Sequence, residues 1–220
     1  MTPVILLTDS YLANGSELWN IPSMKDMPEI NPPLVPDNAE NFYPYNRDPE
    51  RLNRYWAIPG QPGLRHRVGG LEKEDVTGEV SHDAMNHEIM VELREQKVQK
   101  VSEFIPQQEV VGPEEGDLLV VGWGGTYGAL VSAVNDLQEE EKSISLAQFT
   151  YINPLPANTA EVFSRYKKIL VCELNLGQFA NYLRSKHPQV EYLQYNKVQG
   201  LPLFISELKV KFKEVLETIK

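Results

Sequence analysis

The sequence contains a single cysteine, Cys172, among its 220 residues. One cysteine excludes an internal disulfide framework and any zinc or iron–sulfur site built only from cysteines of this chain. No stretch approaches the roughly 18 consecutive apolar residues of a membrane span. The start, Met1-Thr2-Pro3, also lacks the basic leader and small-residue cleavage site of a signal peptide. We therefore expect a cytoplasmic protein that does not enter a membrane.

Basic residues are also scarce, because 21 Lys and Arg face 31 Asp and Glu, for a formal net charge of -10. Nonspecific binding to nucleic acid depends on clustered Lys and Arg, so this acidic chain is not expected to bind nucleic acid. Any anionic ligand must be held by a local cluster of basic side chains.

Proline is concentrated at one end, since ten of the 16 prolines precede residue 63. Proline lacks a backbone donor and pushes the residue before it to extended geometry, so no long helix or central strand is expected there. Aromatic residues such as Trp19, Phe42 and Trp56 are too frequent for a disordered linker. We predict that residues 9–80 form a long ordered arm that lies on another surface.

The run Val4-Ile5-Leu6-Leu7 is typical of a fully buried parallel strand. It has no helix before it, and Asp9-Ser10 follows it directly. One interpretation is a strand in the main sheet of this chain. The favoured interpretation is the last strand of a domain whose earlier part precedes residue 1.

A regular alternation of apolar patterns begins near residue 84. It predicts strands over 117–122, 143–151, 168–173 and 190–195, and helices over 87–104, 126–141, 159–166, 177–186 and 206–219, the last capped by Ser206. Strands that alternate with helices indicate right-handed crossovers and a largely parallel sheet with helices on both faces.

A glycine-rich turn follows the first of these strands and opens a helix, with Gly122, Gly124, Gly125 and Thr126 as its candidate ligand-binding residues. Free N–H groups and the helix dipole suit such a turn to a phosphate. A dinucleotide fingerprint would need glycine where Tyr127 stands, and no Gly-Lys-Ser/Thr ending is present. A tight strand-to-helix turn capped by Thr126 is therefore the favoured interpretation.

Six basic residues gather in the arm: Arg47, Arg51, Arg54, Arg65, His66 and Arg67. The guanidinium fork suits a carboxylate or a phosphate, and the glycines on both sides of residues 65–67 allow close approach of the backbone. Alternatively, these arginines pair with nearby Glu50, Glu72, Glu74 and Asp75. Both interpretations stay open, and this region is the most promising for function.

Several strings, taken together and in order, resemble one family, the 2-oxoacid:ferredoxin oxidoreductases, and within it the alpha subunits of the 2-oxoglutarate enzymes. They are residues 3–9 (PVILLTD), 11–17 (YLANGSE), 59–73 (PGQPGLRHRVGGLEK), 122–128 (GWGGTYG), 153–158 (NPLPAN), 173–178 (ELNLGQ) and 197–200 (KVQG). Each string is weak by itself, and the series covers nearly the whole chain.

The resemblance implies an α/β fold in two parts. Residues 1–80 would hold the last strand of a truncated pyrimidine-type thiamine diphosphate domain and a connecting arm. Residues 81–220 would form a three-layer α/β/α sandwich similar to the transketolase C-terminal domain, in relatives a sheet of about five strands with one antiparallel edge.

The resemblance also implies an activity: oxidative decarboxylation of 2-oxoglutarate to succinyl-CoA and carbon dioxide, with electrons passed to ferredoxin. Thiamine diphosphate, Mg and iron–sulfur clusters would belong to the whole complex, coenzyme A would be the co-substrate, and a beta subunit would be the partner. The isolated chain would be inactive, and a dimer is also considered. Arg54 or Arg65, with His66 and Arg67 nearby, would reach the distal carboxylate of the 2-oxoacid.

Two further hypotheses belong to other classes of protein. The first is a non-catalytic binding or assembly module that docks a partner through residues 9–80. The second is a nucleotide-binding regulator that uses the turn at residues 122–128, which the tyrosine at position 127 disfavours.

Overall fold

The structure, a computed structural model, describes residues 1–36 and 41–219, which form two compact units. The first unit comprises Met1–Ile5 and Glu17–Phe104, and the second comprises Leu6–Ser16 and Ile105–Lys220. The long helix α2 (Ala84–Lys100) belongs to the first unit, whereas the sequence-based boundary at 80/81 assigns it to the second.

The second unit contains a parallel sheet of four strands: β1 (Gly116–Trp123), β2 (Ile144–Phe149), β3 (Tyr166–Glu173) and β4 (Tyr192–Asn196). Their order in the sheet is β2-β1-β3-β4, so β1 and β3 are central. Leu146 and Leu170 flank Val120 in register on its two sides. Both faces of the central strands are buried, which explains their continuous apolar runs.

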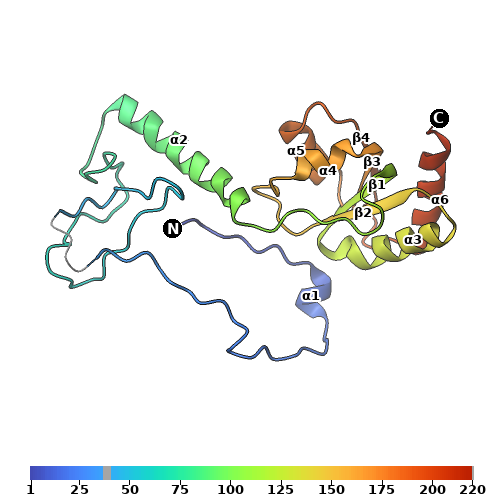
Figure 1. Ribbon diagram of the computed structural model, residues 1–220, viewed down its shortest axis with the longest axis horizontal. Helices are drawn as coiled ribbons and strands as arrows, with labels where there is room; N and C mark the ends of the chain where they lie inside the picture. Colours follow the sequence, from blue (N-terminus) through green and yellow to red (C-terminus); the bar gives the residue numbers. More distant parts are fainter. Residues whose placement is uncertain (37–40, 220) are drawn as a thin grey trace. The chain divides into compact units, whose positions relative to one another are not determined.

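Helices cover both faces of this sheet, as the alternation of patterns predicts (Figure 1). One face packs against α3 (Tyr127–Glu139) and α6 (Ile205–Glu217), and the other against α4 (Thr159–Ser164) and α5 (Gln178–Lys186). Successive residues of β1 alternate between the two core layers, with Leu118 in one and Leu119 in the other. The predicted three-layer α/β/α sandwich is confirmed.

The edge of the sheet beside β2 carries one antiparallel pairing. Val111 and Leu146 exchange backbone hydrogen bonds of 2.8 and 3.0 Å in an isolated antiparallel bridge. The implied fifth strand with antiparallel direction is thus reduced here to a single bridge.

The predicted strand over residues 4–7 does not form. Val4, Ile5 and Leu6 are 91%, 83% and 85% exposed and belong to no sheet, so the interpretation as a strand of the main sheet is wrong. A strand needs a neighbour for its backbone groups, and the described residues supply none at this position. A short helix, α1 (Ser10–Asn14), follows, with Asp9 as its N-cap.

The predicted cap of the last helix is also wrong. Helix α6 begins one residue earlier than expected, so Phe204 occupies the N-cap position and Ser206 lies inside the first turn. An N-cap side chain accepts from the backbone N–H of a residue two or three positions later, and a serine inside the helix is not placed to do so. No side-chain hydrogen bond caps α6.

The first unit is a long irregular arm joined to α2 and the 3₁₀ turn η1 (Val101–Glu103). The arm holds its shape through isolated bridges such as Leu34 to Trp56 and Lys73 to Val80. The buried hydrophobic residues described in this unit are Val35, Leu64 and Met90. Of the apolar stripe predicted along α2, only Met90 is therefore buried.

Candidate functional site

The glycine-rich turn joins β1 to α3 through the 3₁₀ turn η2 (Gly124–Thr126). The Thr126 hydroxyl accepts from the Trp123 N–H at 3.2 Å and donates to the Trp123 carbonyl at 2.8 Å. Gly124 has a φ of 58°, a conformation that favours glycine. Threonine thus closes the turn as the tight-turn interpretation requires.

A carboxylate of the same chain lies against this turn. A Cβ built on Gly125 would be only 1.8 Å from Oδ2 of Asp9, so only glycine admits that carboxylate. The negative charge of the Asp9 carboxylate interacts favourably with the positive end of the helix dipole of α3. The same charge would repel a phosphate group at this position. The geometry therefore favours a tight turn over a phosphate cradle formed by Gly122, Gly125 and their neighbours.

A second carboxylate, Glu173, is fully buried at the carboxyl end of β3. It accepts from the backbone N–H groups of Phe179 (2.8 Å) and Ala180 (3.1 Å) at the start of α5, and from the Trp123 indole N–H (3.2 Å). In open parallel sheets this place, where successive connections leave in opposite directions, commonly binds ligands. Here an internal carboxylate occupies the helix N-terminus and ties the ends of β1 and β3 together.

Beside the turn lies a cavity of about 670 Å³. Its lining comes from three places: Tyr11 in α1, the start of α3, and the segment that opens α6. The lining residues are Tyr11, Gly125, Thr126, Gly128, Ala129, Pro202, Leu203, Phe204, Ile205 and Ser206. No Lys, Arg or His lies in this lining, so the cavity does not suit an anion.

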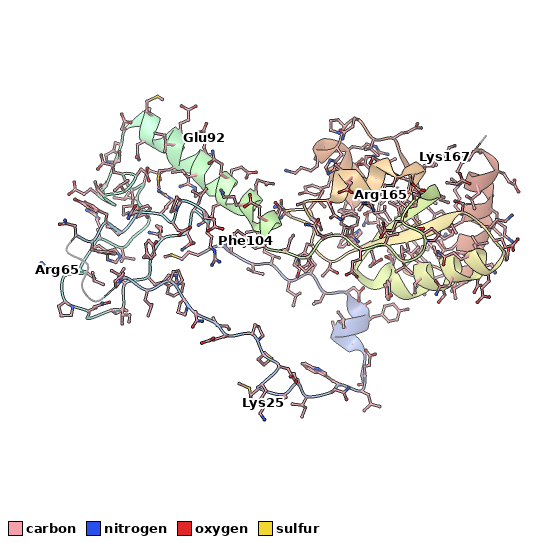
Figure 2. All side chains as sticks on the ribbon, in the orientation of Figure 1. Lys25, Arg65, Glu92, Phe104, Arg165 and Lys167 are labelled. Carbon is pink, nitrogen blue, oxygen red and sulfur yellow. The ribbon has the colours of Figure 1, made fainter. Side chains whose placement is uncertain are left out.

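The predicted substrate residues 65–67 lie on the surface of the first unit. Arg65, His66 and Arg67 are all exposed, and Figure 2 shows Arg65 at the outer edge of the arm. The His66 Nδ1 donates to the Leu64 carbonyl at 2.8 Å, and its ring meets the edge of Phe42 at a centroid distance of 5.2 Å. The arginine side chains on either side make no hydrogen bond or ion pair within the described ranges.

The other arginines of the arm divide between the two interpretations. Arg47 forms an ion pair with Asp75, as the pairing alternative predicts. Arg54 has no carboxylate partner among residues 1–36 and 41–219; its guanidinium lies 4.3 Å from the centroid of the Tyr45 ring and donates to the Pro44 carbonyl at 3.5 Å. Arg51 stacks on Phe104 at 5.1 Å.

Arg54 also borders a cavity of about 340 Å³ within the first unit. The lining combines the arm with one face of α2: Tyr45, Arg47, Arg54, Gly70, Leu71, Glu72, Lys73, Met90, Leu93, Arg94 and Lys97. Residues 65–67 are not among them, so the structure does not bring Arg54 and Arg65 to one cavity.

Arg94 and Lys97 escaped the sequence-based prediction. Burial, then the charges of Arg54, Arg47 and Arg94, lower the pKa of Lys97. The available signal was the helical spacing of positions 90, 94 and 97, which places them on one face of α2. Without the course of the arm, nothing indicated that this face meets Arg54.

The described residues offer no set of side chains for binding a metal ion. The described His, Cys, Asp and Glu residues contain no group of three that could hold a metal ion. Cys172 is fully buried, and burial raises the pKa of its thiol, which leaves it an inert core residue. Among the described residues, no helix is long and apolar enough to cross a membrane.

Comparison with known proteins identifies relatives, although no family model matches the sequence. The chain is 42% identical over 208 residues to 2-oxoglutarate oxidoreductase subunit KorA of Mycobacterium tuberculosis, a match that covers 94% of this chain and 31% of the relative. It is 29% identical to 2-oxoacid:ferredoxin oxidoreductase 2, subunit alpha, of Aeropyrum pernix, over 99% of this chain and 34% of that one.

A solved structure supports the same relationship. The 2-oxoglutarate:ferredoxin oxidoreductase from Magnetococcus marinus, with 2-oxoglutarate, coenzyme A and succinyl-CoA bound, superposes with a TM-score of 0.80 and 27% identity. The match covers 89% of this chain and 34% of that chain. The chain is therefore a homologue of the alpha subunits of 2-oxoacid:ferredoxin oxidoreductases and spans about a third of the length of the relatives it matches.

Proposed function

We propose that the chain is the C-terminal part of the alpha subunit of a 2-oxoglutarate:ferredoxin oxidoreductase in the cytoplasm. The observation that carries the proposal is the 42% identity over 208 residues to a 2-oxoglutarate oxidoreductase subunit. The enzyme would convert 2-oxoglutarate and coenzyme A to succinyl-CoA and carbon dioxide, and two electrons would pass to ferredoxin.

The cofactors of this reaction belong elsewhere in the complex. Thiamine diphosphate supplies the electron sink for decarboxylation, and Mg and iron–sulfur clusters hold the diphosphate and carry electrons. The described residues of this chain do not fit these groups, since they form no metal-ligand cluster and the one cysteine is buried. We assign these groups to a beta subunit and to other parts of the enzyme, and expect the isolated chain to be inactive.

The proposed role of this chain at the substrate is to recognise the distal carboxylate. Arg54 supports that role because its guanidinium has no carboxylate partner in the described ranges and is oriented by the Tyr45 ring. Arg65, with His66 and Arg67, is exposed and free to contact a neighbouring part of the enzyme. An arginine at a second carboxylate distinguishes 2-oxoglutarate from a monocarboxylate such as pyruvate, because an unpaired buried charge is costly.

The proposed division of the chain follows the resemblance. Residues 1–80 would complete a thiamine diphosphate domain and connect it to residues 81–220. The exposure of Val4, Ile5 and Leu6 supports this role, because a run of that kind becomes buried once a neighbouring strand pairs with it.

One observation favours a second candidate function, a non-catalytic module that docks a partner. Residues 18–30 of the arm expose large apolar side chains, among them Leu18 (101%), Trp19 (84%) and Ile21 (93%). Contiguous exposed apolar surface is typical of an interaction site. A docking arm is also compatible with a subunit of an enzyme, so only activity separates the two candidates.

The test is anaerobic reduction of a viologen dye that depends on both 2-oxoglutarate and coenzyme A. This chain alone, the full-length alpha subunit with its beta partner, and the same pair with Arg65→Ala or Arg54→Ala would be compared. Activity in the full pair alone supports the enzyme, and loss with one substitution in an assembled complex identifies the arginine. A folded, cofactor-loaded pair that is inactive with every 2-oxoacid would leave the docking module.

A further inference from the structure

The cavity between the arm and α2 has an unbalanced charge. Five cationic side chains line it: Lys73, Arg47, Arg54, Arg94 and Lys97. Two carboxylates offset them, Asp75 paired with Arg47 and Glu72 at 3.4 Å from Arg94. Within residues 1–36 and 41–219, Arg54 and Lys97 have no carboxylate in ion-pair contact. Three positive charges thus remain at one place in a chain whose net charge is -10.

Other carboxylates of α2 do not correct this imbalance. Figure 2 shows Glu92 on the side of α2 that faces away from the arm, as expected for a position about 140° around the helix from Lys97. Glu95 is exposed and accepts from the Gln99 side chain at 2.8 Å. The helix therefore presents Arg94 and Lys97 to the cavity, whereas Glu92 and Glu95 are not part of its lining.

The cavity brings like positive charges close together. Lys97 is half-buried and lies near three guanidinium groups, whose charges lower its pKa together with burial. Like charges that are close together in a medium less polar than water repel each other strongly. A bound anion would remove this repulsion, which is a common reason for such a cluster at a binding site.

The donors of the cavity are held in place before any ligand arrives. The Arg54 guanidinium rests on the Tyr45 ring, and the Lys97 ammonium donates to the Met1 carbonyl at 2.6 Å, which leaves two of its three hydrogens free. Arg47 is fixed by Asp75 and by the Tyr45 carbonyl at 3.1 Å. Donors that are already oriented bind an oxyanion with little further loss of entropy.

We propose that this cavity, lined by Arg47, Arg54, Arg94 and Lys97, binds a multiply charged oxyanion, a dicarboxylate or a phosphate group. Its volume of about 340 Å³ admits a small molecule or one end of a larger one and is too small for a whole nucleotide-based cofactor. The proposal that this cavity binds an oxyanion is independent of the proposed reaction. Only the identity of the physiological ligand rests on the proposed function. Charge-assisted hydrogen bonds from guanidinium and ammonium groups supply the recognition.

The test is a titration of the full chain by calorimetry at low salt with three anions and one control. Inorganic phosphate and coenzyme A probe a phosphate ligand, 2-oxoglutarate probes a dicarboxylate, and acetate is the singly charged control. At least one multiply charged anion should bind, with an affinity that falls as salt rises. The ratio of the affinities of phosphate and 2-oxoglutarate identifies the source of the oxyanion.

Three variants of the lining and one control variant locate the binding. Lys97→Gln and Arg54→Gln should each weaken it by about tenfold or more, because each removes a charge-assisted hydrogen bond. Lys97→Arg keeps the charge and should retain binding within a few-fold. Lys100→Gln, one turn further along α2 and outside the lining, is the matched control and should bind as the unchanged chain does.

The result that overturns the proposal is equal binding by Lys97→Gln and Lys100→Gln, or no binding of any of the three anions at millimolar concentration. Loss of folding is checked by the melting temperature of each variant without ligand. Lys97→Gln should melt no lower than the unchanged chain, since it relieves repulsion. Because the readout is binding, failure of the site is distinguishable from failure of the proposed reaction, which the viologen assay reports.

Discussion

The two compact units of this chain are stabilised in different ways. In the second unit, a four-stranded sheet and its helices enclose two apolar layers in which most side chains are inaccessible to solvent. In the first unit, the described buried hydrophobic residues are Val35, Leu64 and Met90, and isolated bridges and polar contacts hold the arm. Hydrophobic burial is the dominant favourable contribution to folding, so the second unit has the means to fold by itself and the first depends on further contacts.

Charge separates the units in the same way. Ion pairs of the second unit connect neighbouring elements, as Lys197 does with Glu207 and Lys209 with Asp136. The cavity of the first unit instead gathers cations that exceed their carboxylates. The second unit therefore has a continuous apolar core and paired charges between its elements, whereas the first unit has few buried apolar side chains and an excess of cations in its cavity.

The largest effect is expected from truncation of the sheet core. Leu170→Ala removes a fully buried side chain from the centre of β3 and should lower the free energy of unfolding by about 2–5 kcal/mol. Leu18→Ala, at a fully exposed position of the arm, should change it by less than about 0.5 kcal/mol. Urea denaturation of both variants measures the difference. Equal losses would break the contrast between the units.

A smaller loss is expected when the buried carboxylate at the end of β3 is neutralised. Glu173→Gln keeps one acceptor oxygen and replaces the other by an NH₂ group, so at least one of the three N–H donors that meet this carboxylate loses its acceptor, and the change should cost about 1–3 kcal/mol of unfolding free energy. Glu161→Gln, whose partner Arg165 is near the surface, is the matched control. An unchanged stability for Glu173→Gln would mean that α5 does not depend on this acceptor.

The helices and strands of the second unit could be predicted from the sequence because the spacing of apolar residues within each segment determines them. Apolar runs of strand length and helical stripes such as Leu130, Val134 and Leu137 specify which face is buried. The beginning of α6 was misplaced because serine at position 206 resembles a cap, whereas the Leu208 N–H donates to the Phe204 carbonyl at 3.0 Å and so starts the helix earlier. The strand at residues 4–7 was predicted from composition, and pairing depends on residues outside the run.

The cavity of the first unit could be predicted only in part. Arg54 belongs to the arginine cluster that the sequence singles out in an acidic chain, but the sequence also groups it with residues 65–67, which do not line this cavity. Arg94 and Lys97 resemble ordinary surface cations of a helix, and their role depends on the irregular course of residues 41–80. Irregular backbone has no periodicity, so sequence patterns cannot bring its residues to a given helix face.

A substitution in the cationic cavity sharpens the comparison, because it is expected to stabilise the chain. Lys97→Gln should raise the melting temperature slightly without anion, since it removes a charge that neighbouring guanidinium groups repel. The pKa of Lys97 is lower in the folded chain than its ordinary value of 10.5, so the unfolded chain binds more protons between those values. Stability of the unchanged chain relative to Lys97→Gln should therefore rise as the pH increases towards 10.5. If the unfolding free energies of the two proteins change equally with pH across this window, the pKa of Lys97 is not lowered by its neighbours and the inference of repulsion is wrong.

The smallest effect is expected at a carboxylate of the second unit, and its pH dependence has the opposite direction. The buried Lys197 ammonium donates to Glu207 at 2.6 Å and holds the pKa of that carboxyl below its ordinary value. A depressed carboxyl pKa contributes stability that is present above the ordinary value and is lost as the pH falls through the folded value. Melting temperatures of the unchanged chain and Glu207→Gln should thus differ at neutral pH and converge in acid, whereas Glu214→Gln, at an exposed pair, should show little difference at either. Acid would then destabilise the second unit, in which Glu207 is paired with Lys197, whereas alkaline pH would stabilise the first unit, in which Lys97 lies near other cations.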